Sequence, residues 1–443
     1  MWSRRKEVIT IERILNLTWR VKEMDQKYQD IVNLLKKELI TAMGCTEPIA
    51  IAYAAARARE VLAEEVTAID VKCSGNIIKN VKGVIVPTTK DMRGIETSAI
   101  LGVVGGNPDQ KLEVLQGVGK EHIDKAKALI EAGICKVHLV EGVENLYIKV
   151  IVRSIENSAE VTIVDSHTNI IEIKRNQDVI FESKETMHKD ENTNSALSFE
   201  EIYDFAKNVD IKLIKELMKK QAELNMAISQ VGMSVDYGAR IGKTIMSRDT
   251  MTVMNKAKAY AAAASDARMG GCELPVVINS GSGNQGITAS IPVVVYADDI
   301  NASEEDLYRA LALSNLIALY IKNGIGKLSA YCGVVGAACG AVAGIGFLKG
   351  DSGEIIETAI SNSLGITSGM ICDGAKASCA AKIAVALDGA MIGMDMAENK
   401  QEFLFGEGII GQNVDDTIYN IWRLGKDGMK ETDIEILKMM LGE

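Results

Sequence analysis

The spacing of apolar residues changes along the chain. Between residues 26 and 43, apolar side chains recur three or four positions apart, which predicts an amphipathic helix. Gly44 is a typical helix end, and Pro48 suits the first turn of a second helix. Beyond that helix, short runs read as strands because they are apolar or alternate between apolar and polar residues. The predicted strands are Thr67–Cys73, Val84–Pro87, Val137–Val140, Leu146–Arg153, Glu160–Asp165 and Ile170–Lys174.

The later part of the chain has helical spacing instead. The polar segment Lys184–Ser198 is the best candidate for a linker, and Ser198 with Glu201 has the pattern of a capping box. The exception is residues 273–295, where a glycine-rich loop separates two apolar runs. We therefore predict an α+β fold, with an N-terminal unit of antiparallel sheet and helices joined to a mainly α-helical, Gly/Ala-rich C-terminal domain. The predicted boundaries are 1–23 for an N-terminal extension, 24–190 for the α+β domain and 191–443 for the helical domain.

Composition and charge narrow the class of protein. The net charge of −11 argues against nucleic acid or an anionic membrane as the main partner. An uncharged stretch, Leu328–Leu348, is rich in Gly and Ala, so we expect a buried helix rather than a membrane span. Gly336, Gly340 and Gly344 would let another helix approach it closely. The N-terminus lacks the apolar core of a signal peptide. These features favour a cytoplasmic protein that acts on a small molecule. The sequence also leaves room for a homo-oligomer.

The cysteines are the first candidates for chemistry. Cys332 and Cys339 are seven residues apart, and so are Cys372 and Cys379. On a helix that spacing is roughly 10 Å, too long for two ligands of one zinc ion, although it could suit a larger iron–sulfur cluster. The alternative is that these thiols are small buried side chains of a Gly/Ala-rich core. Cys45 stands just before a predicted helix, where the helix dipole would stabilise a thiolate and lower its pKa.

Two polar segments could bind a substrate. Ser74 and Asn76 follow a predicted strand in a turn, and turn chemistry explains them equally well. The later glycine-rich loop offers free N–H groups to a carboxylate or phosphate, although an ordinary turn between two strands would have the same composition. Its candidate substrate-binding residues are Asn279, Ser280, Ser282, Gly283, Asn284 and Gln285. The four histidines, of which none is spaced for a metal, favour surface roles. They are His122, His138, His167 and His188.

Three interpretations of this chemistry remain open from the residues. A pyridoxal-phosphate lyase would use the SGSGNQG loop, but it needs a Schiff-base lysine, for which Lys322 and Lys327 are only guesses. An iron–sulfur lyase would use three thiolates for a cluster with one open iron, Cys45 as a base and the loop for a carboxylate. An iron–sulfur redox sensor would need only the thiols and would leave the loop and the GCTEP motif unexplained.

Taken together, several motifs resemble one known family. MGCTEP (Met43–Pro48), SGN (Ser74–Asn76), INSGSGNQG (Ile278–Gly286) and the late cysteines are similar to the L-cysteine desulfidase family, within the superfamily of iron–sulfur L-serine dehydratase α-chains. This resemblance extends from about Met24 to the C-terminus and so covers most of the chain. It implies that Cys332, Cys372 and Cys379 hold a 4Fe–4S cluster, that Cys45 is the base, and that Cys339 is a buried structural thiol.

The resemblance also implies a reaction. L-Cysteine would lose its β-substituent as sulfide, and the aminoacrylate product would hydrolyse to pyruvate and ammonia. L-Serine is the alternative substrate for the same mechanism. Single-chain serine dehydratases carry an extra regulatory-type β domain and a terminal cysteine, whereas this chain ends in KMMLGE. The N-terminal part is similar to the desulfidase arrangement, so the expectation is L-cysteine ahead of L-serine.

Overall fold

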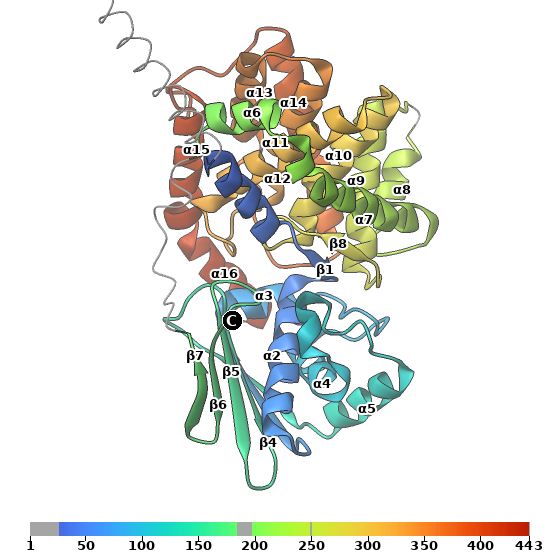
Figure 1. Cartoon of the computed structure of the whole chain (residues 1–443), viewed down its shortest axis with the longest axis vertical. Helices are drawn as coiled ribbons and strands as arrows, with labels where there is room; N and C mark the ends of the chain where they lie inside the picture. Colours follow the sequence, from blue (N-terminus) through green and yellow to red (C-terminus); the bar gives the residue numbers. More distant parts are fainter. Residues whose placement is uncertain (1–25, 184–196, 249, 443) are drawn as a thin grey trace, which may run out of the picture.

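The chain has an α+β part and a larger helical part, which confirms the predicted fold class (Figure 1). The computed structural model describes residues 26–183, 197–248 and 250–442. The predicted extension, 1–23, and nearly all of the predicted linker lie outside these ranges.

A mixed six-stranded sheet forms the frame of the α+β part. Its strands lie in the order β3-β2-β4-β5-β6-β7, and every neighbouring pair is antiparallel except β2 with β3. The strand bounds are β2 Ala68–Cys73, β3 Cys135–Leu139, β4 Tyr147–Arg153, β5 Ser158–Val164, β6 Ile170–Arg175 and β7 Asp178–Glu182.

Helices between β2 and β3 explain the parallel pair. They are α3 (Gly75–Val81), α4 (Gly94–Gly105), the 3₁₀-helix η1 (Pro108–Glu113) and α5 (Lys120–Glu131). Parallel strands need such a long crossover, so the expectation of a purely antiparallel sheet was wrong at this position. The alternating patterns did predict strands β2 to β6, whereas β7 was not predicted.

Two further predictions near the N-terminus were wrong. The helix expected to reach residue 43 ends at residue 38, and Thr41–Met43 forms strand β1, antiparallel to β8 (Pro275–Val277) of the helical part. The segment expected as strand Val84–Pro87 forms only one bridge, between Ile85 and Arg93. Proline has no N–H to donate to a ladder, so this segment cannot continue as a strand beyond residue 86.

The helical part follows the predicted spacing. A capping box at Ser198 and Glu201 starts α6, as expected. The apolar run after the glycine-rich loop forms helix α10, and not the second of two strands joined by a turn. Ser282 of the loop is the N-cap of this helix. The main helices are α6 Phe199–Asn208, α7 Lys215–Ser234, α8 Ile241–Met246, α9 Val253–Met269, α10 Gly283–Asp299, α11 Glu304–Asn323, α12 Val334–Lys349, α13 Gly353–Thr367, α14 Ser378–Glu398, α15 Val414–Arg423 and α16 Lys430–Leu441. Two short elements complete the set, the 3₁₀-helix η2 (Ile211–Leu213) and the π-helix η3 (Leu424–Gly428).

The glycine stripe of α12 allows close packing against α11, as predicted. A methyl group added at Gly340 would lie 2.2 Å from the carbonyl oxygen of Ser314, and one at Gly344 would lie 2.8 Å from the carbonyl oxygen of Ala310. The contacted atoms are backbone, so no rotamer change would relieve the clash. Among the described residues, no helix is both long and apolar enough to cross a membrane.

Gly340→Ala tests this packing. We expect the substitution to destabilise the protein by about 1–3 kcal/mol, because the added methyl must push two buried helices apart. Gly117→Ala is the matched control, since a methyl group there meets nothing within 4 Å. Thermal unfolding midpoints measured side by side should fall only for Gly340→Ala; equal midpoints for both variants would contradict the close approach.

Segments from both ends of the chain hold the two parts together. Tyr28, on the helix at residues 26–38, donates a hydrogen bond to Asp204 of α6 at 2.6 Å, so this first helix lies against the helical part. Strand β1 then leads directly into α2 (Thr46–Leu62), which packs on the sheet. At the other end, α16 packs on α3 of the α+β part (Figure 1). The GCTEP motif therefore begins at the junction between the two parts.

Candidate functional site

A cavity with about 680 Å³ of empty space lies at this junction, and four of the chain's cysteines line it. Cys45 reaches it from the start of α2, while Cys332, Cys372 and Cys379 reach it from the helical part. Cys339 is fully buried and does not line the cavity. The structure thus separates Cys339 from Cys332 despite their seven-residue spacing.

A single backbone bridge brings Cys332 and Cys372 together. Tyr331 pairs with Ile371, the N–H of Cys332 donates to Met370 O at 3.1 Å, and the N–H of Cys372 donates to Ala330 O at 2.6 Å. The two cysteines are 40 positions apart in the sequence, with α12 and α13 between them, yet the bridge makes them neighbours.

The third late cysteine comes from a helix start. Cys379 lies in the first turn of α14, where its N–H donates to Lys376 O at 3.0 Å. Its side chain packs in one small apolar cluster with Cys45, Val84 and Met269. Among the three late cysteines that line the cavity, Cys379 is therefore the one that packs against Cys45 of the GCTEP motif.

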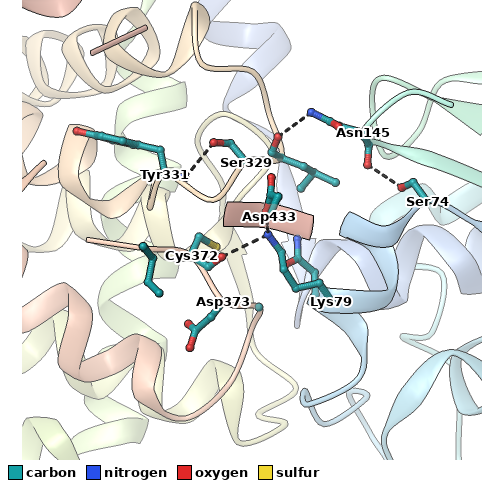
Figure 2. A network of polar contacts seen from close by, with 12 residues as sticks. Ser74, Lys79, Asn145, Ser329, Tyr331, Cys372, Asp373 and Asp433 are labelled. Carbon is teal, nitrogen blue, oxygen red and sulfur yellow. Dashed lines mark hydrogen bonds and ion pairs between the residues drawn. The ribbon is translucent and has the colours of Figure 1, made fainter. Parts of the chain in front are cut away.

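Two buried lysines lie near the thiols of Cys332 and Cys372. Lys79 of α3 donates to Cys372 O at 3.3 Å and forms an ion pair with Asp433 of α16 (Figure 2). Lys322 of α11 lines the cavity, and its burial lowers its pKa to about 8. A hydrogen bond from Cys332 lowers the pKa of Cys372 to about 6; burial opposes this change, and Lys79 and Lys322 support it.

These residues fit an iron–sulfur cluster. Three thiols converge on one cavity, and the two buried cations would offset the negative charge of thiolate ligands. Within the described ranges, no three Cys, His, Asp or Glu side chains are grouped closely enough to hold a single metal ion. A cluster is larger than one ion, and separated cysteine thiolates are its usual protein ligands.

The GCTEP motif places a thiol against a carboxylate. Cys45 is itself the N-cap of α2, and its Sγ donates to Glu47 Oε2 at 3.1 Å. Asn80 donates to Glu47 Oε1 at 3.0 Å. Thr46 Oγ1 has two acceptors within reach, Gly281 O at 2.9 Å and Glu47 Oε2 at 3.2 Å. The carboxylate is therefore held by side-chain donors on both of its oxygens.

The electrostatics of this pair differ from the sequence expectation. Burial raises the pKa of the Cys45 thiol well above its usual value, Glu47 raises it further, and Arg268 only partly opposes this. The expectation of a lowered pKa at the helix start was wrong in direction. Burial alone would also raise the pKa of Glu47, but His167 and the Cys45 thiol lower it to about 2. Glu47 is thus a buried anion beside a protonated thiol.

His167 is a site residue that sequence reasoning missed. It lies in the turn between β5 and β6 and is only 4% exposed, so a surface role was wrong for this histidine. Its Nε2 is 3.8 Å from Glu47 Oε1 and has no hydrogen-bond partner. A methyl group added at Gly281 would lie 3.1 Å from its Cε1. His167 therefore packs between the GCTEP motif and the glycine-rich loop.

The glycine-rich loop is a tight turn that feeds α10. Ser280 and Gly281 both have positive φ, at 51° and 78°, and Asn279 and Ser282 exchange backbone hydrogen bonds across them, as in a type I′ turn. The first turn of α10 follows at once, and the N–H groups of a helix's first turn have no partner within the helix. The loop residues that line the cavity are Ser282, Asn284 and Gln285.

Three other predicted loop residues have different positions. Asn279 is fully buried and donates to Asn315 Oδ1 at 3.0 Å, so it supports the turn. Ser280 faces a neighbouring cavity, lined also by Leu34 and Glu38 of the first helix. Gly283 packs against the guanidinium of Arg268, a second residue that no sequence pattern singled out.

Ser74 and Asn76 are not brought to the cysteines. Both line a separate cavity with about 1070 Å³ of empty space, between the α+β part and α16. Ser74 Oγ donates to Asn145 O at 2.7 Å, and Asn145 donates in turn to Leu328 O (Figure 2). Ser74 thus takes part in a polar contact that joins the two parts.

Comparisons with known proteins show which families and sequences this chain is similar to. The family model described as "Serine dehydratase alpha chain" matches residues 109–438, which include the three late cysteines and the glycine-rich loop. A protein of Finegoldia magna named "UPF0597 protein" is 48% identical over 415 residues, covering 93% of this chain and 99% of the relative. One of Lachnoclostridium phytofermentans with the same name is 46% identical over 416 residues, covering 94% of this chain and 100% of the relative.

Proposed function

The chain belongs to the serine dehydratase alpha chain family, and from that premise we propose that it is an iron–sulfur lyase that removes sulfide from L-cysteine. The observation that carries the proposal is the single cavity lined by Cys45, Cys332, Cys372 and Cys379. Neither a redox sensor nor a pyridoxal-phosphate enzyme needs this combination of thiols with a helix N-terminus.

Three thiols have one role and the fourth has another. Cys332, Cys372 and Cys379 would hold a 4Fe–4S cluster as thiolates, with Lys79 and Lys322 balancing their charge. With three protein ligands, such a cluster supplies one open iron as a Lewis acid for the leaving sulfur. Cys45 lines the same cavity from the start of α2, and its thiolate is the base for the proton on the substrate's α-carbon.

The remaining steps conserve atoms and charge. The first turn of α10 binds the α-carboxylate, while the thiolate of Cys45 takes the α-proton. The electron pair of that C–H bond forms the new carbon–carbon double bond, and the carbon–sulfur bond breaks with its pair on sulfur. Sulfide takes up a proton as it leaves. Aminoacrylate then adds water and releases ammonia, which leaves pyruvate.

L-Serine is the second candidate substrate. The description of the matched family favours it, and the same base and cavity would then release water in place of sulfide. The proton abstraction by Cys45 is the same for both substrates. They differ only at the leaving atom, so a direct comparison of the two amino acids decides between them.

Anaerobic reconstitution tests the proposal. Purified protein supplied with iron and sulfide should become brown and release sulfide and pyruvate in equal amounts from L-cysteine. kcat/KM should be higher for L-cysteine than for L-serine. The reverse order would replace the substrate and keep the mechanism. Activity that requires pyridoxal phosphate, in protein without bound iron, would overturn the proposal.

A further inference from the structure

Arg268 is a buried cation without a counter-ion. It lies in the last turn of α9, is only 2% exposed and lines the cavity beside Cys45. Its Nη1 donates to Asn284 Oδ1 at 3.1 Å, and its Nε has no hydrogen-bond partner. No carboxylate in the described part of the chain forms an ion pair with it. Since an unpaired buried charge is costly, this arrangement indicates an anionic ligand.

The start of α10 presents a second positive group at the same place. A methyl group added at Gly283 would lie 2.2 Å from Arg268 Nε, so the guanidinium lies directly on the first residue of the helix. The unpaired N–H groups of that turn carry the positive end of the dipole of a 17-residue helix. Fixed donors from two helices therefore converge at one wall of the cavity.

We propose that Arg268 and the first turn of α10 form the receptor for the α-carboxylate of the amino-acid substrate. This inference rests on the proposed function for the identity of the substrate. Arg268 is the specificity-determining residue, because a guanidinium binds a carboxylate through two parallel charge-assisted hydrogen bonds, whereas a neutral amide offers it one acceptor oxygen and no charge. Lys322 lines the same cavity and interacts electrostatically with Cys372 and Cys332, two of the cysteines assigned to the cluster.

L-Alanine and L-alaninamide are matched probes of the receptor. They differ only in the carboxylate, and neither has a leaving group at the β-carbon, so binding is measured without turnover. Anaerobic calorimetric titration of the cluster-loaded protein should show tighter binding of L-alanine. In Arg268→Gln we expect affinity for L-alanine to fall on the order of 100-fold and affinity for L-alaninamide to stay unchanged. Arg268→Lys should lose less, since it keeps the charge without the paired donors.

Two further variants guard against a general effect on folding. Gly283→Ala would displace only the flexible end of Arg268, so the protein should fold normally and still lose affinity for L-alanine. Lys258→Gln removes another buried cation from α9, one paired with Asp388, and should leave affinity for both probes unchanged.

The outcomes separate this inference from the proposed function. Equal affinity of the native protein for the two probes, or undiminished binding of L-alanine by Arg268→Gln, would overturn the receptor. Binding of L-alanine through Arg268 together with no release of sulfide or water from L-cysteine or L-serine would instead overturn the proposed lyase and keep the receptor.

Discussion

Replacing Cys372 by serine is expected to remove the iron–sulfur cluster and with it all lyase activity. Cys372 is the central member of the late triplet, since the backbone bridge between Tyr331 and Ile371 places it beside Cys332 and its sulfur accepts a hydrogen bond from that thiol. A serine hydroxyl has nearly the same size, but it is a far weaker ligand for iron because it does not ionise at neutral pH. Iron content, acid-labile sulfide and visible absorption should all fall to the background after anaerobic reconstitution.

Cys339→Ala is the matched control for this experiment. Cys339 has the same spacing from Cys332 as Cys379 has from Cys372, but it is fully buried within α12 and away from the cavity. We expect the variant to bind as much iron as the native protein and to keep its turnover. A colourless, inactive Cys339→Ala together with an intact Cys372→Ser would show that the ligand set includes Cys339 in place of Cys372.

The late cysteines show how far local spacing predicts a site. The seven-residue spacing gives no reason to prefer Cys379 over Cys339 as a ligand. In the fold, the bridge between Tyr331 and Ile371 brings Cys332 beside Cys372, and Cys379, unlike Cys339, lines the same cavity. That contact joins segments 40 residues apart, and the pattern of apolar and polar residues does not predict it. The resemblance to a family, and not the spacing, singled out the three late cysteines that line one cavity.

Two buried polar side chains show what sequence patterns could not reveal. Arg268 and His167 are prominent in the structure because each is buried and has one nitrogen without a hydrogen-bond partner. In the sequence, Arg268 is one more cation near a helix end, and His167 lies in a polar turn between two strands. Burial and lack of a partner are tertiary properties, so neither residue could be recognised before the two parts of the fold were joined.

The pKa of Cys45 shows how a correct local argument can lose to a larger effect. A helix N-terminus stabilises a thiolate by about 0.3–2 kcal/mol. Full burial shifts a pKa by up to about 3–5 units, at 1.36 kcal/mol per unit. Cys45 is only 3% exposed and donates to the anionic Glu47, so burial and like charge together outweigh the helix dipole. The sequence placed Cys45 correctly at the helix start but could not show its burial.

A raised pKa is compatible with a role as a base. Brønsted behaviour makes a less acidic thiol a stronger base once it has lost its proton, and the α-proton of an amino acid is hard to remove. The consequence is that only a small fraction of Cys45 is ionised near neutral pH. kcat/KM should therefore rise as the pH rises toward the pKa of Cys45.

Substitutions in the GCTEP motif test this role through rate and pH together. Cys45→Ala should keep the cluster and lower kcat by about 10²–10⁴-fold, the usual contribution of a general base. In Glu47→Gln the negative charge beside the thiol is gone, so thiolate formation is easier and the pKa of Cys45 falls. The rise of kcat/KM with pH should then move to lower pH by about one unit or more. Because a purely structural effect of Glu47→Gln would scale the rate at every pH alike, an unshifted profile would remove Cys45 as the base.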